Sequence, residues 1–168
     1  MGVAALEVVI REATTADFPE ILRLNLESER LLSPLSLERL QWLHSAAWYC
    51  RIIGSGSSVQ GFLIALREGL AYDSLNYRWF IGRYSEFLYV DRVVIDAAAR
   101  GRQLGVRLYE DLFERAQRAQ VRRITCEFDI EPPNEASRRF HERFGFHEVG
   151  RQRVAGGQKA VSLQEVTL

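Results

Sequence analysis

One segment constrains the fold of this chain more than any other. The run 87–95, FLYVDRVVI, is rich in β-branched and aromatic residues and holds no glycine or proline, which predicts a strand near the centre of a sheet. A glycine- and arginine-rich stretch follows it, and apolar residues then recur at helical spacing from 104 to about 120. We therefore expect a buried strand, a turn and an amphipathic helix in direct succession.

Weaker patterns on either side of this segment predict the rest of the fold. Alternating or β-rich runs predict strands at 8–11, 49–53, 59–66, 123–128, 147–154 and 159–166. Apolar residues at helical spacing predict helices at 18–26, from about Ser36 to 46, and at 134–144, with Gly145 as the C-terminal cap of the last one. The aromatic stretch 67–86 has no clean period and is expected to be a long excursion between strands. Together these elements predict one α+β domain over 1–168, with a mixed, mostly antiparallel central sheet and helices on both faces.

Charge and apolar content exclude several classes of function. The 168 residues hold 22 lysines and arginines against 22 aspartates and glutamates, so the formal net charge is zero. No global positive field is present to hold a nucleic acid or an anionic membrane, and no window approaches the roughly 20 apolar residues of a transmembrane helix. The two cysteines stand in separate apolar runs without a metal-binding or redox spacing, which favours buried free thiols. We expect a soluble, cytoplasmic protein without a metal, a membrane or a nucleic acid as partner.

The turn after the central strand has the composition of an anion-binding site. It consists of Arg100, Gly101, Arg102, Gln103, Leu104 and Gly105. Backbone N–H groups and the positive end of a helix dipole converge at such a point, and arginine adds charge-assisted hydrogen bonds. The stretch predicts a phosphate cradle, and a loop with a solvated cap is the alternative. A dinucleotide-binding turn is a weaker match, because no G-x-G-x-x-G motif opens the chain.

The helix expected from 134 onward carries a second set of polar residues. Asn134, Ser137 and His141 are spaced to share one face of this helix, while Phe140 and Phe144 are expected to point toward the core. Taken singly, Asn134 is interpreted as a helix cap and His141 as a surface histidine. The functional interpretation depends on their combination with the preceding turn.

In order and spacing, the two sets resemble the GNAT superfamily of acyl-CoA N-acyltransferases over most of the chain. The turn 100–105 resembles the family's pyrophosphate loop, [Q/R]-x-x-G-x-[G/A], and residues 134–146 resemble the helix that ends in Gly-Phe. The resemblance implies a GNAT-like fold whose sheet splays apart at the acyl-CoA site. It also implies acetyl-CoA as the co-substrate, no metal, and direct attack of a primary amine on the thioester.

The resemblance further implies roles for the backbone of the central strand and the turn. Backbone groups of Val93 and Ile95 would hold the pantetheine arm of acetyl-CoA. The N–H near Val94 would polarise the thioester carbonyl, an electrostatic contribution of a few kcal/mol. The turn 100–105 would hold the pyrophosphate.

Side chains of the second set receive roles in the same way, and two positions depart from the family pattern. Asn134 and Ser137 would bind the neighbouring phosphate and pantetheine groups. Gln103 replaces the usual middle glycine of the loop, where a positive φ would cost roughly 1 kcal/mol or more. His141 stands where many members carry the tyrosine that protonates the departing thiolate, and it would donate a proton, or at least a hydrogen bond, to the sulfur of CoA. Its ordinary pKa is ~6.5 against ~10 for tyrosine, so turnover would fall as the pH rises past the pKa of His141.

The acceptor amine must lose a proton before it attacks, since a free alkylamine has a pKa of ~10. Candidate bases are Asp91, Glu86 and Asp129. Asp91 ranks first, because strand alternation places it on the face of the expected pantetheine contacts, and a structural ion pair is its alternative role. Cys126 as an acyl-carrying nucleophile is disfavoured, because nothing in the sequence activates it.

The sequence leaves the acceptor open. The aromatic stretch 72–84 precedes the central strand, where family members often shape the acceptor pocket, and it alternatively packs a hairpin or a dimer contact. We expect a small-molecule or peptide amine as acceptor, and a monomer or a homodimer. The main alternative to an enzyme is a non-catalytic acyl-CoA-binding module, in which Gln103 and His141 are signs of a degenerate site. Release of CoA with an amine separates the two.

Overall fold

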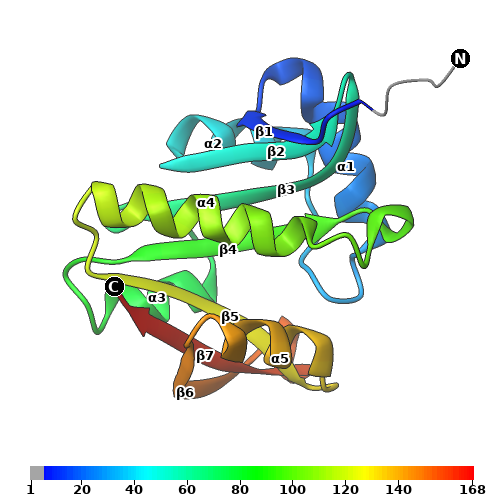
Figure 1. Ribbon diagram of the computed structural model, residues 1–168. Coiled ribbons are helices and arrows are strands. Elements are labelled where there is room, and N and C mark those ends of the chain that lie inside the picture. Colours follow the sequence, from blue (N-terminus) through cyan, green and yellow to red (C-terminus); the bar gives the residue numbers. More distant parts are fainter. Residues whose placement is uncertain (1–5) are drawn as a thin grey trace, which may run out of the picture. The chain divides into compact units, whose positions relative to one another are not determined.

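The computed structural model describes residues 6–168. Seven strands follow one another in the sheet in the order β1-β2-β3-β4-β5-β7-β6 (Figure 1). The pairs β1·β2, β2·β3, β5·β7 and β6·β7 are antiparallel, and β4·β5 is parallel. The predicted α+β fold with a mixed, mostly antiparallel sheet is therefore confirmed.

The predicted succession of strands and helices is also confirmed, with one addition. The strands are β1 (Val9–Glu12), β2 (Tyr49–Ser55), β3 (Ser58–Arg67), β4 (Leu88–Ile95), β5 (Arg123–Glu131), β6 (His147–Val154) and β7 (Lys159–Thr167). The helices are α1 (Phe18–Glu27), α2 (Leu37–Ala46), α3 (Leu75–Ile81), α4 (Leu104–Arg118) and α5 (Glu135–Arg143). Within residues 6–168, none of these helices has the length and apolar character needed to cross a membrane.

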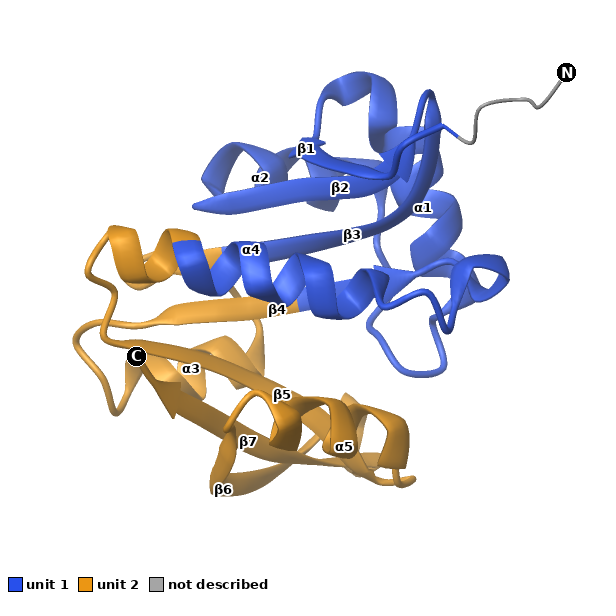
Figure 2. Ribbon diagram, viewed as in Figure 1, with its two compact units in different colours: residues 1–65, 92–114 blue, residues 66–91, 115–168 orange. Residues whose placement is uncertain are grey.

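Two compact units make up the chain (Figure 2). Unit 1 combines the residues up to 65 with 92–114, and unit 2 combines 66–91 with 115–168. β4 therefore begins in unit 2 and ends in unit 1, whereas α4 begins in unit 1 and ends in unit 2. The expectation of a single domain over 1–168 stays a prediction.

In unit 1, a side-chain cap stabilises the start of one helix, and side-chain hydrogen bonds join another helix to a strand. The first turns of α4 lie in front of the strands, and α1 and α2 lie behind them (Figure 1). Ser36 caps α2, because its Oγ accepts a 3.1 Å hydrogen bond from the N–H of Arg39. On the α4 side, Asp111 Oδ2 accepts hydrogen bonds from Tyr49 at 2.8 Å and from Arg51 at 2.9 Å. These bonds fix α4 over β2.

Unit 2 carries one helix on each face of its strands. Tyr89 of β4 lies opposite Thr125 of β5, so these two side chains share a face. Tyr77 of α3 contacts the ring of Tyr89 with centroids 5.5 Å apart, which places α3 on that face. Phe128, three residues beyond Thr125, points to the opposite face, where it stacks on His141 of α5 at 5.9 Å.

The addition is α3, which lies inside the stretch that was expected to be an excursion without regular structure. Ser74 caps this helix, with its Oγ accepting from the N–H of Tyr77 at 3.3 Å. Tyr77 and Phe80 are completely buried, and they anchor α3 in the aromatic core of unit 2. Seven residues make fewer than two full turns, which is too short for a helical period to stand out in the sequence.

Candidate functional site

The turn between β4 and α4 has the backbone shape that an anion cradle requires. Asp96 begins the turn: its N–H donates to the carbonyl oxygen of Gln60 at 2.8 Å, and its Oδ1 accepts from the N–H of Ala98 at 2.9 Å. The backbone then enters the left-handed region twice, at Gly101 (φ 79°) and at Gln103 (φ 61°). Gln103 thus has the positive φ whose cost was considered from the sequence. α4 begins directly after this residue.

The same turn offers both room and charge to a phosphate group. Arg100, Gly101, Arg102 and Gln103 are exposed, while Leu104 is buried and anchors the start of α4. A Cβ atom placed on Gly101 would meet nothing within 4 Å, so the backbone here is open to a ligand. Two exposed guanidinium groups beside the first turn of a helix fit the pyrophosphate of an acyl-CoA.

The strand that leads into this turn is tightly packed. Val94 is buried, and Val93 and Ile95 are half-buried. β3 approaches so closely that a Cβ atom on Gly61 would lie 2.8 Å from the carbonyl oxygen of Val94. Glycine is therefore required at position 61. The peptide groups at 93–95 consequently have little freedom to move, which suits a backbone amide that stabilises an oxyanion.

The positive φ of Gln103 has a measurable consequence for stability. A left-handed backbone costs a residue with a Cβ atom about 1 kcal/mol relative to glycine. Because the folded turn already has this conformation, Gln103→Gly should raise the free energy of unfolding by up to about 1 kcal/mol. Gly101→Ala adds the same kind of strain at φ 79° without a steric clash, so it should lower the free energy of unfolding by a similar amount. Denaturant titration measures both, and equal free energies of unfolding in all three proteins would contradict the prediction.

The polar residues at the start of α5 are linked to one another. Asn134 caps the helix, with its Oδ1 accepting from the N–H of Ser137 at 3.2 Å. One turn further on, Nδ1 of His141 lies 2.7 Å from the carbonyl oxygen of Ser137 and 3.2 Å from the Oγ of Ser137. The predicted cap is thus confirmed, and the three residues lie together on one side of the helix in unit 2.

His141 is a core residue, contrary to its interpretation as a surface histidine. Only 4% of it is exposed, and its ring meets Phe140 and Phe146 edge-on at 5.3 and 5.2 Å in addition to the stack on Phe128. Phe140 and Phe144, which were expected to point into the core, are half-buried. The helix is therefore rotated so that the imidazole, and not the phenyl groups, lies deepest.

Burial changes the protonation state of His141. Loss of hydration lowers its pKa to about 4, an effect that the carbonyl of Ser137 only partly offsets. Because a carbonyl oxygen can only accept a hydrogen bond, Nδ1 carries the single ring proton and Nε2 holds a lone pair. Near pH 7 the ring thus has no proton at Nε2 to donate. At this pKa an imidazolium that protonates the departing thiolate is disfavoured near pH 7, and the catalytic role of His141 stays a prediction.

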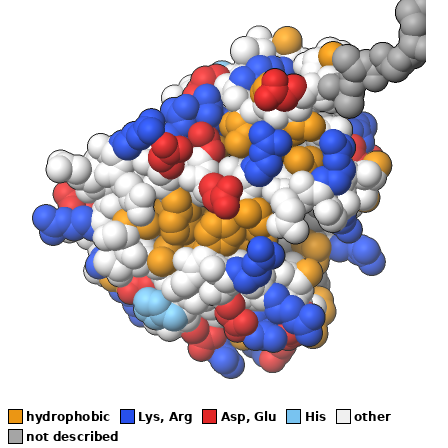
Figure 3. Space-filling view, viewed as in Figure 1, with side chains coloured by type: hydrophobic (Ala, Val, Ile, Leu, Met, Phe, Trp, Pro, Cys, Tyr) orange, Lys and Arg blue, Asp and Glu red, His pale blue; other side chains and the backbone are white. Residues whose placement is uncertain are grey.

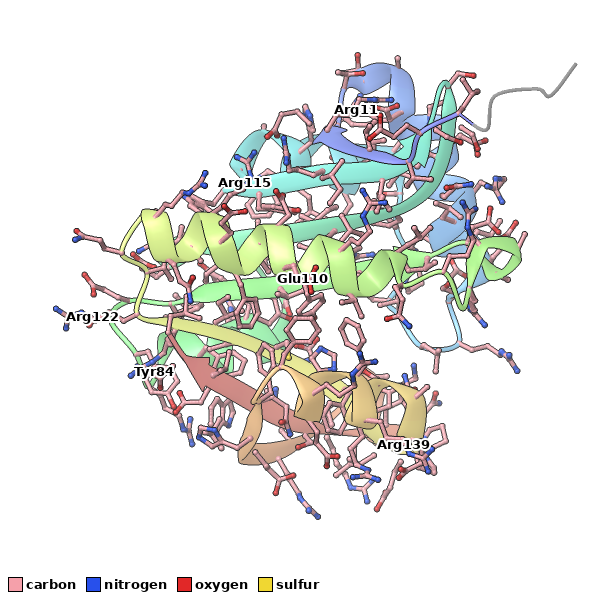
Figure 4. The ribbon with its side chains drawn as sticks, viewed as in Figure 1. Arg11, Tyr84, Glu110, Arg115, Arg122 and Arg139 are labelled. Atoms are coloured by element: carbon pink, nitrogen blue, oxygen red, sulfur yellow. The ribbon has the colours of Figure 1, made fainter. Side chains whose placement is uncertain are left out.

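Two of the carboxylates considered as bases lie in contrasting surroundings within unit 2. Asp91 is half-buried, and its Oδ1 accepts a short hydrogen bond, 2.6 Å, from the hydroxyl group of Tyr72. Glu86 precedes β4, and its side chain is 58% exposed, with Oε2 4.0 Å from Nε of Arg122. Arg122, labelled in Figure 4, lies beside the end of the chain, because its carbonyl oxygen accepts a 3.0 Å hydrogen bond from the N–H of Leu168. Asp91 therefore has the fixed orientation that a base needs, whereas Glu86 does not.

Asp129 and Glu127 are two further acidic residues of unit 2. Burial raises the pKa of Asp129, although Lys159 Nζ lies 3.3 Å from its Oδ2. Tyr89 is buried, and its hydroxyl group lies 2.8 and 2.9 Å from the two carboxylate oxygens of Glu127. Sequence reasoning missed Glu127 and the tyrosine partners. The sequence shows that Glu127 alternates with Asp129 along the strand. It does not show that Glu127 pairs with Tyr89, which lies 38 positions away.

The predicted site residues therefore fall into two groups. Unit 1 contains the backbone at 93–95 and the whole turn 100–105. Unit 2 contains the three candidate bases and the polar residues of α5.

Comparison with known proteins identifies the chain. The model of the acetyltransferase (GNAT) family matches residues 18–146, which include the turn, the central strand and α5. The chain belongs to the GNAT acetyltransferase family. The family assignment and the fold that the sequence resemblance implied are both confirmed, and the protein is placed among the acyltransferases.

Relatives in sequence and in structure agree with this assignment. Phosphinothricin N-acetyltransferase from Streptomyces coelicolor is 41% identical over 64 residues, which are 38% of this chain and 36% of that protein. The match thus spans about a third of the length of this curated relative. The ribosomal-protein-S18-alanine N-acetyltransferase from Escherichia coli superimposes with a TM-score of 0.73 at 16% identity, covering 96% of this chain and 94% of that one. The NatC complex bound to Gag peptide and CoA gives a TM-score of 0.76 at 17% identity over 97% and 99% of the chains. Such structural likeness establishes the fold.

Proposed function

We propose that this GNAT acetyltransferase transfers an acetyl group from acetyl-CoA to the nitrogen of a primary amine, by direct attack of the amine on the thioester. The observation that carries the proposal is the turn 100–105, with two exposed arginines and two left-handed residues at the start of a 15-residue helix. Acetyl transfer within the family and the CoA bound to the NatC neighbour support acetyl-CoA as the donor.

The proposed contacts of acetyl-CoA with the turn and with the β4 backbone come from unit 1. Arg100 and Arg102 neutralise the pyrophosphate, and backbone groups of Val93 and Ile95 hold the pantetheine arm. The N–H of Val94 then stabilises the negative charge that develops on the thioester oxygen. This hydrogen bond contributes a few kcal/mol when the N–H group is held in position before the reaction. In this proposal the charges on the turn serve the binding of acetyl-CoA, and the rigid backbone of the strand serves catalysis.

The proposed acid–base chemistry uses unit 2. Asp91 takes the proton from the acceptor ammonium, directly or through a water molecule, so that the nitrogen lone pair attacks the thioester carbon. The new C–N bond forms as the C–S bond breaks, and the CoA thiolate receives a proton from solvent. Asn134 and Ser137 contact the neighbouring phosphate and pantetheine groups. His141 stays neutral and supports α5 from inside the core.

The acceptor is proposed at the level of a chemical class, a small-molecule or peptide amine. The names of the relatives cover both, a phosphinothricin enzyme on one side and a ribosomal-protein enzyme on the other. On the face seen in Figure 3, acidic and basic side chains are interspersed with apolar ones. This distribution disfavours a nucleic acid as the acceptor. We place the reaction in the cytoplasm, in a monomer or homodimer.

The donor half of the proposal is tested without knowledge of the acceptor. Calorimetric titration with acetyl-CoA, CoA and 3′-dephospho-CoA should give a dissociation constant that rises about tenfold or more in Arg100→Ala, because a charge-assisted bond to phosphate is lost. Arg115→Ala is the matched control, since this residue, labelled in Figure 4, lies in the last turn of α4. Its affinity for CoA should equal that of the wild type.

Turnover then decides between an enzyme and a binding module. A panel of amines and peptide N-termini is screened for release of CoA by the wild type and by Arg100→Ala. Turnover that weakens in Arg100→Ala supports the enzyme. Tight binding of acetyl-CoA without release of CoA with any amine would favour the binding module, and no binding at all would overturn both.

A further inference from the structure

Two charged residues flank the backbone at 93–95, and both are bound by α1. Arg92 comes directly before this segment, and Asp96 directly after it. All of these residues belong to unit 1 (Figure 2). The proposed donor contacts do not involve either side chain, so the burial of Arg92 and the hydrogen bonds of both residues need a separate explanation.

Arg92 is connected to α1 inside the core. Only 4% of Arg92 and 1% of Asn25 are exposed. Arg92 Nη1 donates to Oδ1 of Asn25 at 2.9 Å and to the carbonyl oxygen of Ser33 at 3.3 Å, and Nδ2 of Asn25 donates to the same carbonyl at 3.2 Å. Charge-assisted bonds are stronger at low dielectric, and a closed network of this kind has few alternative arrangements. It therefore holds the start of the segment to α1.

Asp96 is connected to α1 at the other end. Arg23 Nη2 donates to Oδ2 of Asp96 at 3.1 Å, while Oδ1 of Asp96 caps the turn. The N–H of Ala98 and the guanidinium of Arg23 both lower the pKa of Asp96. Arg23 is itself held by Glu20 at 3.0 Å and by Glu27 at 2.8 Å on its own helix. Its guanidinium is thus oriented by α1 before it meets the turn.

We propose that α1 positions the amide of Val94 for acetyl transfer, through Asn25 on one side and Arg23 on the other. The inference rests on the proposed function, because it assigns Val94 to the developing oxyanion. Asn25 and Arg23 are positioning residues, since they contact Arg92 and Asp96 and not the reacting atoms. The hydrogen bond from the Val94 N–H is strongest in the transition state, where the oxygen carries negative charge. If residues 93–95 become more mobile, the chemical step slows without weaker binding of acetyl-CoA.

The experiment separates positioning from stability with pairs of variants. Asn25→Leu removes both polar groups of the side chain, and Asn25→Asp restores the acceptor for Arg92. We expect kcat to fall about tenfold or more in Asn25→Leu with a change in the KM for acetyl-CoA of less than about twofold, and Asn25→Asp to recover most of the rate. Arg23→Gln should lower kcat about threefold in the same manner. Glu27→Gln is its control, because it removes one partner of Arg23 and leaves the contact with Asp96 intact.

A readout that does not need turnover guards against a variant that folds poorly and against failure of the proposed function. Hydrogen exchange of the 92–96 amides in the CoA-bound protein should quicken about tenfold in Asn25→Leu and in Arg23→Gln, and not in Glu27→Gln. Unchanged exchange in these variants, or a rise in KM with kcat unchanged, would overturn the positioning role. A wild type that binds CoA, turns over no amine and still shows the exchange pattern would overturn the proposed function alone.

Discussion

Replacement of Asp91 by asparagine should lower kcat about a hundredfold or more at pH 7, the loss expected when a general base is removed. The KM for acetyl-CoA should change by less than about threefold, because Asp91 has no part in the donor contacts. The amide oxygen of asparagine can still accept the hydrogen bond of Tyr72, which spans 2.6 Å in the wild type. The variant therefore removes the proton acceptor and keeps the local structure. Steady-state kinetics with the best amine of the screen measures the effect.

Two further carboxylates serve as controls for this prediction. Glu86→Gln should retain nearly full activity, since the side chain is 58% exposed at the start of β4. Asp129→Asn is the sharper comparison, because burial already raises the pKa of Asp129 toward the range of a useful base. A large loss in Asp129→Asn beside a nearly normal Asp91→Asn would move the role of base to Asp129.

Elements that carry their own signal were predictable from the sequence. β4 and α4 combine apolar periodicity with strong propensity, and the cap residues Ser36, Asn134 and Gly145 mark helix ends by local chemistry alone. The turn 100–105 was predictable for the same reason, since its glycine and arginines act through the backbone and charge. The motif drew attention to Gln103, but its left-handed φ was established only by the structure.

Features that depend on residues far apart in the chain were not predictable in this way. α3 is stable because Tyr77 and Phe80 are buried against β4, and a seven-residue segment has no period of its own. Likewise, Tyr72 and Asp91 are 19 positions apart, and Asn25 and Arg92 are 67 positions apart. A sequence shows that such residues are polar, but only the fold shows which of them meet.

The rotation of α5 illustrates the same limit within a single helix. Spacing placed Asn134, Ser137 and His141 on one side, and they do lie together. Spacing could not decide which side faces the core, because phenylalanine is the more usual core residue. The burial of His141 follows from its aromatic neighbours, Phe128 and Phe146, which come from outside the helix. This burial alters the acid–base chemistry that the residue type alone would suggest.

His141 should therefore make the protein lose stability in mild acid. Its pKa is lowered from the ordinary 6.5 to about 4 by burial. As the pH falls, the unfolded chain takes up a proton near pH ~6.5, whereas the folded protein does so only near pH ~4. The stabilisation is thus fully present above pH ~6.5, and it is lost as the pH falls from there to the folded pKa of about 4. A difference of this size corresponds to about 3 kcal/mol in the free energy of unfolding.

Denaturant titrations of the wild type and His141→Phe at a series of pH values measure this contribution. The phenyl ring fits the aromatic surroundings and does not titrate, so the free energy of unfolding of the variant should fall about 2–3 kcal/mol less between pH ~7.5 and pH ~4.5. The other titrating groups are common to both proteins and cancel in the difference. His147→Phe is the matched control, because it makes the same substitution at a histidine whose side chain is 60% exposed.

The same variant decides the chemical role of the residue. A ring with a pKa of about 4 is neutral between pH ~6 and pH ~8 and cannot be the acid in turnover there, so the pH–rate profiles of the wild type and His141→Phe should have the same shape in that range. If the two stability curves were instead parallel, and a rate limb near pH 6.5 vanished in His141→Phe, His141 would be accessible and protonated in the working enzyme. The proton for the CoA thiolate would then come from α5 and not from solvent.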